Sequence, residues 1–399
     1  MKIAFVYDAV YPWVKGGAEM RNHELGKRLS ARGHEVHIFG VKWWEGKDTI
    51  EYENMTLHGV CKARDLYVNG RRSISEALIF ALKLFPALWK EKFDLIDVSV
   101  FPYFSCFTVK VVTLLRRTPS VFTWHEVWDN YWYEYMGKAG FFGKVIENAV
   151  SKISEKNVAV SDWTKKRLEV LGVPEKNIVV IPNGIDLKKI SKIKPEGDLP
   201  AFDGRTSPGF DRKIYDVIFA GRLIKEKNVD ILLKAVALLK ADFPDIRCCI
   251  VGDGPEKAEL VKLAKKLAVY GNVEFAGFQE YEVLIGKVKA SKMLVLPSSR
   301  EGFGMVVIEA FACGVPVVTV REKYNAAQGL VDDGVDGFVV QLGDREIAAG
   351  VEKILGNERG YTEMTAFAVN KTGKYEWAAI SEQLLLWYME QGYKTSKKK

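Results

Sequence analysis

The chain opens with the apolar run Lys2-Ile3-Ala4-Phe5-Val6-Tyr7, whose length and side chains are typical of a buried β-strand. A loop that contains Gly16 and Gly17 follows, and a helical pattern then extends from Ala18 to Arg32. A second strand-like run occupies Glu35–Phe39. Strand, helix and strand in this order predict a βαβ unit, which is how doubly wound α/β domains begin.

The alternation of strands and helices continues along the chain and restarts once. In the first half, further strand-like runs lie at Leu95–Ser99, Ser120–Trp124, Asn157–Val160 and Ile178–Ile181. The stretch from Ser191 to Lys213 is rich in Lys, Asp, Gly and Pro, which predicts an exposed connection. After this connection, strand-like runs lie at Asp216–Ala220, Arg247–Val251, Val273–Phe275, Met293–Leu296, Val315–Val318 and Gly337–Val340.

We therefore predict an α/β chain of two Rossmann-like, doubly wound domains that face each other across a cleft. A length of 399 residues supports two domains, because a single hydrophobic core rarely grows beyond about 250–300 residues. The first domain is expected to span residues 1–187 and the second residues 188–374. A long amphipathic pattern near Glu376 to Gln391 predicts a last helix, within about 375–399, that joins the first domain.

Composition indicates an ordered protein of a reducing compartment. Apolar residues make up 48% of the chain and charged residues 27%, which excludes a disordered chain. The five cysteines form no CxxC pair and the first residues resemble a strand rather than a cleavable signal, so we expect a cytoplasmic protein. The net charge of +7 arises from interspersed residues, so no nucleic acid is expected as a partner. An anionic substrate and an anionic membrane surface both remain open.

The most apolar segment, Ile74 to Trp89, is too short and too interrupted by polar residues and proline to span a bilayer. Within it and beside it lie an apolar stripe and several basic residues: Ile74, Leu78, Ile79, Leu82 and Phe85, with Arg71, Arg72, Lys83, Lys90 and Lys92. A helix bound peripherally at the cytosolic face of a membrane would have this pattern, and a buried core helix explains the stripe equally well.

The segment from Pro297 to Ala310 predicts a ligand with both phosphates and hydroxyls. Its pattern is that of a strand end, a glycine-bearing loop and the start of a helix, where backbone N–H groups can receive an anion. Glu301 and Glu309 lie eight residues apart around that helix start. Because carboxylates repel phosphates, these two are expected to bind sugar hydroxyls. A nucleotide sugar supplies both kinds of group.

Candidate residues in the first half are fewer. Gly16 and Gly17 follow the first strand and would let a ligand approach the backbone, although an ordinary tight turn is an equal alternative. His125 directly follows the run Ser120–Trp124 and could hydrogen-bond a sugar hydroxyl or, when protonated, neutralise charge. A structural histidine is the competing interpretation.

Aromatic residues crowd the segment that follows His125. Domain packing is the commoner explanation for such a cluster, and acceptor binding is the alternative. The residues are Trp124, Trp128, Tyr131, Trp132 and Tyr135.

In the second half, Arg222 and Lys227 follow a strand and could hold a diphosphate, although an exposed basic pair explains them as well. Gly252 and Gly254 follow the next strand, where a base or ribose could lie against the backbone or where the chain simply turns. No DxD triplet and no HExxH motif occurs, so the sequence requires neither a metal nor another cofactor.

Taken together, the motifs resemble the retaining glycosyltransferase family 4, also described as glycosyl transferases group 1, which has the two-domain GT-B fold. The matching pieces span almost the whole chain in family order. They are Gly16-Gly17-Ala18-Glu19, His125, Val160-Ser161, Ile181 to Asp186, Ala220-Gly221-Arg222-Leu223 with Lys227, Val251 to Pro255, Glu301 to Ala310, and Gly314 to Val318. The stretch Arg321 to Gly329 departs from the glycine-rich turn of many relatives and leaves the donor sugar open.

The resemblance implies a role for each matching position. Arg222 and Lys227 would bind the donor diphosphate, Glu309 the ribose and Glu301 the transferred sugar. The backbone at Phe303, Gly304 and Met305 would meet sugar and phosphate, Gly16 and Gly17 would approach the donor, and His125 would lie near the reacting carbon. Trp377 would open the last helix. In this scheme the first domain lies on the acceptor side and the second binds the donor.

The implied activity is a metal-independent transfer of a hexose, with retention, from a nucleotide-diphosphate sugar. UDP is the first expectation for the nucleotide and GDP the second, and the acceptor would be a hydroxyl of a glycan, a lipid-linked sugar or a small molecule. A nucleotide-sugar epimerase or hydrolase is the alternative, because a fold does not determine a function. A scaffold without turnover would have lost some of the charged site residues. The oligomeric state stays open.

Overall fold

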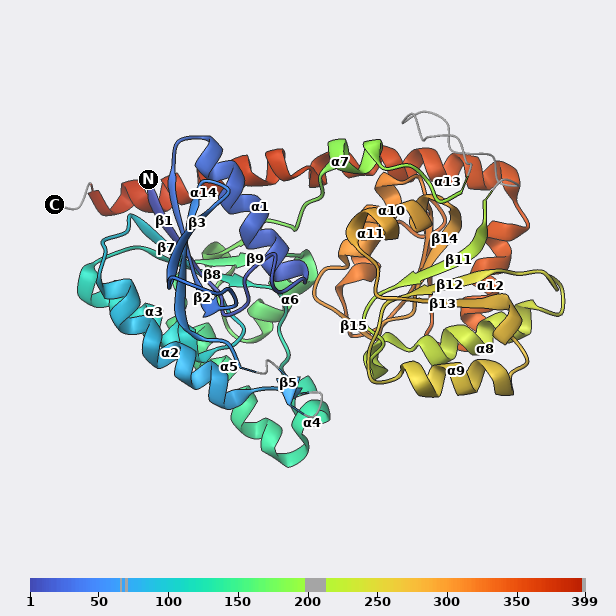
Figure 1. Cartoon of the computed structure of the whole chain (residues 1–399), viewed down its shortest axis with the longest axis horizontal. Coiled ribbons are helices and arrows are strands. Elements are labelled where there is room, and N and C mark those ends of the chain that lie inside the picture. The colour runs from blue at the N-terminus through green and yellow to red at the C-terminus, as the bar shows by residue number, and fades with distance from the viewer. Residues whose placement is uncertain (65–66, 69–70, 198–212, 397–399) are drawn as a thin grey trace. The chain divides into compact units, whose positions relative to one another are not determined.

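The computed structural model describes residues 1–64, 67–68, 71–197 and 213–396 (Figure 1). They form two compact units, one of residues 1–184 with 377–399 and one of residues 185–376. The predicted connection is described only at its two ends. Ser191 belongs to helix α7 (Leu187–Lys192) and Lys213 is buried rather than exposed, whereas residues 198–212 lie outside the described part of the chain.

Unit 1 contains an eight-stranded sheet. Its order is β10 (Ile178–Val180), β9 (Asn157–Ala159), β8 (Ser120–Trp124), β7 (Leu95–Ser99), β1 (Lys2–Val6), β2 (Glu35–Lys42), β4 (Met55–Lys62) and β3 (Thr49–Tyr52). All neighbours are parallel except β3 and β4, which form an antiparallel edge. The short strands β5 (Tyr67–Val68) and β6 (Arg71–Arg72) pair separately.

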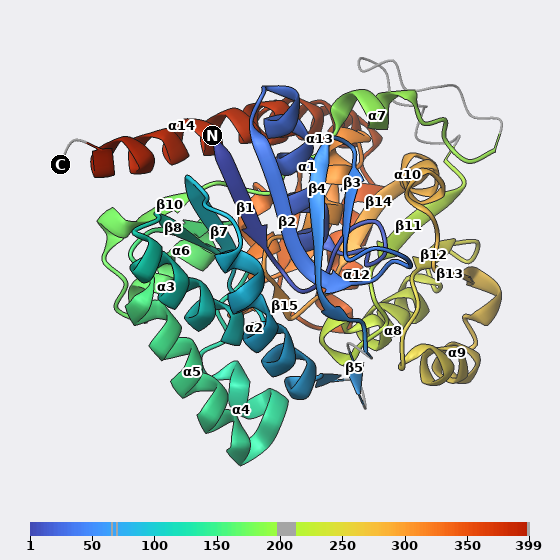
Figure 2. The same cartoon turned by 60° about the vertical axis from the view of Figure 1, so that its left-hand side comes forward.

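Helices cover both faces of this sheet. They are α1 (Gly17–Ala31), α2 (Ile74–Trp89), α3 (Phe104–Arg116), α4 (Tyr131–Met136), α5 (Gly140–Ile153), α6 (Asp162–Val170) and α14 (Trp377–Ser396). Helices α2 and α3 lie side by side on one face, and α1 packs with α14 on the other (Figure 2). The core therefore includes Trp377 and Tyr388 from the last helix together with Phe5 from the first strand.

Unit 2 contains a six-stranded parallel sheet. Its order is β13 (Val273–Gly277), β12 (Cys248–Val251), β11 (Tyr215–Ala220), β14 (Ser291–Leu296), β16 (Val317–Val320) and β18 (Gly337–Val340). The helices are α7, α8 (Val229–Leu239), α9 (Lys257–Lys266), α10 (Tyr281–Lys289), α11 (Met305–Ala312), α12 (Asp344–Leu355) and α13 (Glu358–Lys371). Strands β15 (Arg300–Glu301) and β17 (Tyr324–Asn325) form a small parallel pair beside the main sheet.

Some elements begin at residues other than those expected, and for one strand the physical reason is clear. Strand β16 begins at Val317 rather than Val315 because Pro316 has no N–H to donate, and its carbonyl instead accepts from the Leu294 N–H at 3.0 Å. Helix α9 begins at Lys257, so Pro255 precedes its first turn. The antiparallel strands β3 and β4 were not anticipated.

Two further observations concern the cysteines and the hydropathy of the helices. All five cysteines are unpaired. Among the helices of the described residues, none combines the length and hydropathy that crossing a bilayer requires.

Candidate donor and sugar site residues

In unit 2, three loops at the carboxyl ends of strands are tied together by backbone hydrogen bonds. The Leu223 N–H donates to the Asp253 carbonyl at 2.8 Å, which joins the loops after β11 and β12. The Ser299 N–H donates to the Glu226 carbonyl at 2.9 Å, which joins the loop after β14 to the loop after β11. The predicted residues that follow these strands are therefore brought to one edge of the sheet, as expected for a parallel α/β domain.

Gly252 and Gly254 are required by the close approach of two of these loops. Their φ angles are +137° and +159°, a region that residues with a side chain rarely adopt. A Cβ on Gly252 would lie 1.9 Å from the carbonyl oxygen of Gly221, and one on Gly254 would lie 2.3 Å from that of Leu223. Both glycines thus have a packing role, and their contact with a ligand stays a prediction.

Lys227 and Glu301 form an ion pair that the sequence did not reveal. The ammonium group donates to a Glu301 carboxylate oxygen, and the two side chains are only 14% and 15% exposed. The structure thereby places the predicted phosphate-binding cation against the predicted sugar-binding carboxylate. Arg222, at the start of the same loop, is exposed. A cation and a carboxylate side by side can serve a ligand that joins a phosphate to a hydroxyl-bearing ring.

The start of α11 lies next to this pair. Gly304 caps the helix with a φ of +100°, and a Cβ there would come 2.7 Å from the Cβ of Ala327. Met305 is the first helical residue, so its N–H belongs to the unpaired group at the helix start. Phe303 is buried and packs edge-on against Tyr375, with ring centroids 6.0 Å apart. Its side chain is therefore structural, which leaves its backbone for a ligand.

The segment that departs from the family pattern lies beside the same loop. In β17, Tyr324 pairs with Arg300 and Asn325 with Glu301. The Asn325 side chain in turn accepts from the Ala327 N–H at 3.0 Å. Residues 324–327 thus lie beside Glu301, the proposed sugar contact. From this position they could influence which sugar the site accepts.

Glu309 projects from the second turn of α11 into a largely buried environment. Burial raises the pKa of its carboxyl group to about 7, and a hydrogen bond from the Tyr281 hydroxyl opposes part of that rise. The carboxyl group therefore changes its charge near neutral pH. An ionised carboxylate here can accept two hydrogen bonds from a cis-diol such as a ribose.

In unit 1, Gly16 and Gly17 form the exposed start of α1. Gly16 is the N-cap in an extended conformation, and a Cβ on it would lie 2.5 Å from a carboxylate oxygen of Glu19. The lack of a side chain keeps this helix start open to a ligand that needs backbone N–H groups.

His125 follows β8, and its Nε2 lies 3.2 Å from the Ser99 hydroxyl oxygen. Burial lowers the pKa of His125 to about 3, and the charge of Arg21 adds to the effect. The imidazole is thus neutral at physiological pH. A neutral imidazole fits hydrogen bonding to a ligand hydroxyl and also fits a structural histidine bonded to Ser99, but it does not fit charge neutralisation.

A buried polar network around His125 went unnoticed in the sequence. Arg21 is completely enclosed and donates to the Pro182 carbonyl at 2.6 Å and to Asn183 Oδ1 at 3.1 Å. Asp97 accepts from the hydroxyls of Thr123, at 2.7 Å, and of Tyr388, and burial raises its pKa to about 6. The sequence offered one sign of this network, because Asp97 lies inside the apolar run Leu95–Ser99. A carboxyl group buried in a strand needs hydrogen-bond donors around it.

The aromatic cluster is explained mainly by packing. Trp124, Trp128, Tyr131 and Trp132 are buried, and the rings of Trp128 and Trp132 lie 4.6 Å apart. Tyr135 packs edge-on against Trp128 at 5.0 Å. The commoner of the two interpretations is therefore favoured for the buried members.

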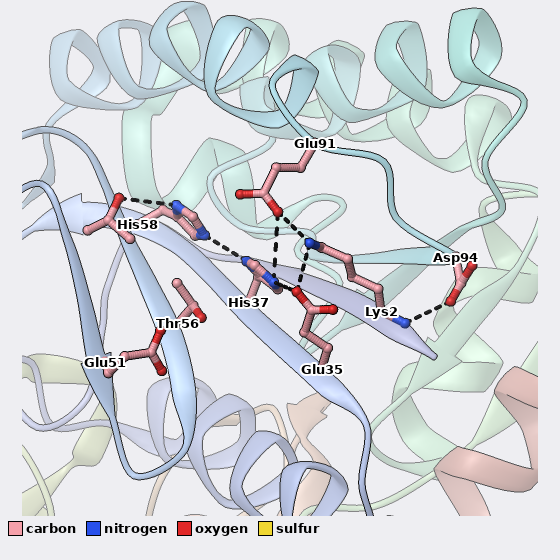
Figure 3. Close-up of polar contacts among 9 residues, drawn as sticks. Lys2, Glu35, His37, Glu51, Thr56, His58, Glu91 and Asp94 are labelled. Atoms are coloured by element: carbon pink, nitrogen blue, oxygen red, sulfur yellow. Dashed lines mark hydrogen bonds and ion pairs between the residues drawn. The ribbon is translucent and has the colours of Figure 1, made fainter.

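Figure 3 shows a separate polar cluster of unit 1 in which His37, His58 and Glu91 have ligand atoms close enough to hold a metal. His37 Nδ1 lies 2.8 Å from His58 Nε2, so one ring donates to the other. The Lys2 ammonium lies 2.7 Å from Glu35 and 2.5 Å from Glu91. A metal ion would have to break the hydrogen bond between the two histidines and the ion pair between Lys2 and Glu91. The polar groups of the cluster are therefore already paired with one another. The absence of a required metal stays a prediction.

Comparisons with known proteins identify the class. The family model for glycosyl transferases group 1 matches residues 203–371, and that for glycosyltransferase family 4 matches residues 15–189. Between them the two models cover most of the chain. The protein belongs to the group 1 and family 4 glycosyltransferases, which confirms the resemblance drawn from the motifs.

Individual relatives agree with this assignment. An uncharacterized glycosyltransferase of Methanocaldococcus jannaschii is 25% identical over 96% of both chains. N-acetyl-alpha-D-glucosaminyl L-malate synthase of Bacillus anthracis is 27% identical over 84% of this chain and 82% of its own. Among solved structures, sucrose-phosphate synthase from Thermosynechococcus elongatus has a TM-score of 0.81 at 21% identity, covering 98% of both chains. The predicted GT-B fold is thus confirmed.

Proposed function

We propose that this glycosyltransferase moves a hexose from a nucleotide-diphosphate sugar to a hydroxyl acceptor, with retention of the anomeric configuration and without a metal. UDP is the favoured nucleotide and GDP the second candidate. The observation that carries the proposal is the pairing of Lys227 with Glu301 beside the start of α11. The pair brings the cation proposed for the phosphate against the carboxylate proposed for a sugar hydroxyl.

One relative supports the choice of UDP, and another supports the transfer of a hexose. HepE of Anabaena was solved in complex with UDP-glucose, and its chain has a TM-score of 0.72 at 20% identity, covering 98% of this chain and 100% of its own. Phosphatidyl-myo-inositol mannosyltransferase of Mycolicibacterium smegmatis is 31% identical over 58% of this chain and 56% of its own. Neither these relatives nor those named above are described as epimerases or hydrolases, so nothing favours that alternative.

The charged groups of unit 2 would divide the donor between them. Arg222 and Lys227 neutralise the diphosphate, and the helix start at Met305 adds backbone N–H donors for the same charge. Glu309 accepts from the ribose hydroxyls, and Glu301 accepts from hydroxyls of the hexose. Lys227 and Glu301 must therefore separate when the donor binds. The ammonium group of Lys227 then contacts phosphate in place of the Glu301 carboxylate.

Transfer would then proceed on one face of the sugar. The bond from the anomeric carbon to the diphosphate breaks as the acceptor oxygen approaches, and a phosphate oxygen takes the acceptor proton. The protein contributes orientation and electrostatic stabilisation rather than a nucleophile. Neutral His125 in unit 1 would bond a hexose hydroxyl, and Gly16 and Gly17 would approach the donor.

Thermal unfolding with nucleotides tests the donor site. A ligand that binds only the folded state raises the melting temperature, so UDP and UDP-sugars should raise it more than GDP, ADP or their sugars. The anomeric configuration of the product, measured by NMR, tests retention. The absence of a shift with every nucleotide would overturn the donor assignment, and an inverted product would overturn the same-face mechanism.

The acceptor and the place of the reaction complete the proposal. A glycan, a lipid-linked sugar and a small molecule all offer the required hydroxyl, and the unpaired cysteines fit a cytoplasmic enzyme that can work at the cytosolic face of a membrane. Incubating the enzyme with donor alone and with each acceptor class, followed by product analysis, separates transfer from hydrolysis.

A further inference from the structure

Unit 1 contains an apolar pocket that none of the proposed donor contacts uses. Its volume is about 410 Å³, within the range of small-molecule binding sites. Its lining includes Ile74, Tyr103, Phe104, Trp132, Phe142 and Gly143. These residues come from α2, α3, α4, α5 and the segments beside them. Nearly every lining group is hydrocarbon or aromatic, so the pocket suits a ligand without charge.

The walls of the pocket are fixed by buried contacts. The Tyr103 hydroxyl donates to Glu147 Oε1 at 2.8 Å, and the Trp128 N–H donates to the same oxygen at 2.7 Å. Gly143 lets α5 approach Trp132, since a Cβ there would come 2.3 Å from that ring.

The surface around the pocket is also apolar. In α2, a stripe of exposed side chains follows a helical spacing, so they lie within about a quarter of its circumference. The stripe consists of Ile74, Leu78, Leu82, Phe85 and Trp89. The buried face of α2 is a different one, which includes Phe80 and Leu84. Of the predicted stripe, Ile74, Leu78, Leu82 and Phe85 are exposed and Ile79 is half-buried, so the structure disfavours the buried-core explanation. On α5, Phe141 and Phe142 are 54% and 69% exposed.

The charges on the same helices favour an anionic surface. The only carboxylates within α2, α3 and α5 are Glu76 and Glu147, and both are buried. The charged residues on the outside of these helices are basic: Lys83, Lys110, Arg116, Lys144 and Lys152. Lys110 pairs with Glu155 at 2.6 Å, Lys144 pairs with Asp129 at 2.9 Å, and α4 has the exposed Glu134, so the basic excess rests on Lys83, Arg116 and Lys152. Exposed apolar and basic side chains on neighbouring helices are the features by which proteins bind anionic membrane surfaces.

We propose that this pocket binds one hydrocarbon chain of a membrane lipid, and that this lipid is the acceptor of the transferase. The basic surface would contact the headgroups while the pocket receives a chain lifted from the bilayer. The role as acceptor rests on the proposed function, whereas chain binding does not. For a free chain taken from water, each additional buried methylene is expected to tighten binding about fourfold.

Quenching of tryptophan fluorescence by brominated chains tests the site directly, because Trp132 lines the pocket. Titration of the full chain with dibromostearic acid should give saturable quenching. Unbrominated fatty acids of increasing length should compete, each added methylene tightening competition about fourfold until the pocket is filled. Quenching that does not saturate, or competition that ignores length, would overturn the pocket assignment.

Two neighbouring residues offer a matched pair of variants. Phe142 lines the pocket and Phe141 does not, yet both are exposed in the first turn of α5, where a carboxylate suits the helix start. Phe142→Glu should weaken chain binding at least about tenfold, whereas Phe141→Glu should change it less than about twofold. Ile74→Glu, at the start of α2, is the second variant should Phe142→Glu fail to fold. Equal losses in the two phenylalanine variants would refute the site.

Vesicles decide the source of the chain. Vesicles of phosphatidylcholine and phosphatidylglycerol in equal parts, with brominated acyl chains, should quench the wild-type protein but not Phe142→Glu. Phe141→Glu places a carboxylate on the exposed apolar surface and should also weaken vesicle binding, so it is the matched control for the fatty-acid titration alone. Quenching by free fatty acid alone would refute a membrane lipid. UDP-induced thermal stabilisation, measured on the same samples, should be unchanged in all variants. Its loss in the wild type would contradict the proposed donor and leave the chain-binding result standing.

Discussion

Replacing Glu301 by glutamine is expected to strengthen nucleotide binding while it slows transfer. The ammonium group of Lys227 is paired with Glu301, and both side chains are largely shielded from water. A diphosphate must compete with this carboxylate for the same ammonium group. Glutamine keeps the shape of the side chain and removes its charge, so the cation becomes available to phosphate.

The size of the effect follows from the burial of the pair. Exposed ion pairs contribute up to about 1 kcal/mol, and removing one partner of a buried pair costs about 3–5 kcal/mol. The two side chains are 14% and 15% exposed, so we take about 1–1.5 kcal/mol as the free energy that UDP must supply to break the pair in the wild type. The variant has no such pair to break, and its UDP affinity should be about five- to tenfold higher. Losing a charged hydrogen bond to the hexose costs about 1.5–3 kcal/mol, which lowers kcat/KM about 10- to 150-fold.

Isothermal titration with UDP and initial rates of nucleotide release measure the two quantities separately. Glu259→Gln is the matched control, because Glu259 pairs with Lys262 at 2.8 Å on the surface, where the side chains are 70% and 72% exposed. Neither quantity should change in this control. If Glu301→Gln lowered UDP affinity and turnover by the same factor, Glu301 would bind the nucleotide rather than the sugar, and the reasoning would be refuted.

Three further outcomes are expected. Since the pKa of Glu309 lies near 7 and ribose binding needs its ionised form, UDP affinity should fall up to about tenfold per pH unit below 7, and Glu309→Gln should abolish this dependence in calorimetric titrations. Tyr388→Phe leaves the buried Asp97 carboxyl with one donor fewer, so urea unfolding should show a loss of about 1–3 kcal/mol, and an unchanged midpoint would contradict this. Gly252→Ala should lower the melting temperature by several degrees because its Cβ meets a carbonyl oxygen at 1.9 Å, whereas Gly271→Ala, with open space around it, should not.

The sequence predicted those parts of the fold that depend on local pattern. Strands Leu95–Ser99 and Ser120–Trp124 occur where the apolar runs lie, because a buried parallel strand is apolar on both faces. The antiparallel strand Thr49–Tyr52 escaped notice because its residues alternate between exposed and half-buried at the edge of the sheet. A polar edge strand offers little that distinguishes it from a loop.

The candidate site was predictable in its residues but not in their pairing. Glu301 was identified from its place between a strand and a helix, and Lys227 from its place after another strand. Their ion pair joins positions 74 residues apart, and no local pattern signals such a contact. The titration of Glu309 near neutral pH likewise depends on burial, which the sequence does not display.

The last helix affects the order in which the protein can be completed during synthesis. Trp377, Ile380, Leu384 and Tyr388 supply part of the core of unit 1, yet the ribosome adds them only after all of unit 2. Domains usually fold in the order in which they emerge. Here the unit that emerges first must wait, while the contiguous residues 185–376 can close their own core. A chain released before Trp377 would keep an open apolar face and a buried Asp97 without its tyrosine, so its first unit should be less stable than that of the finished chain.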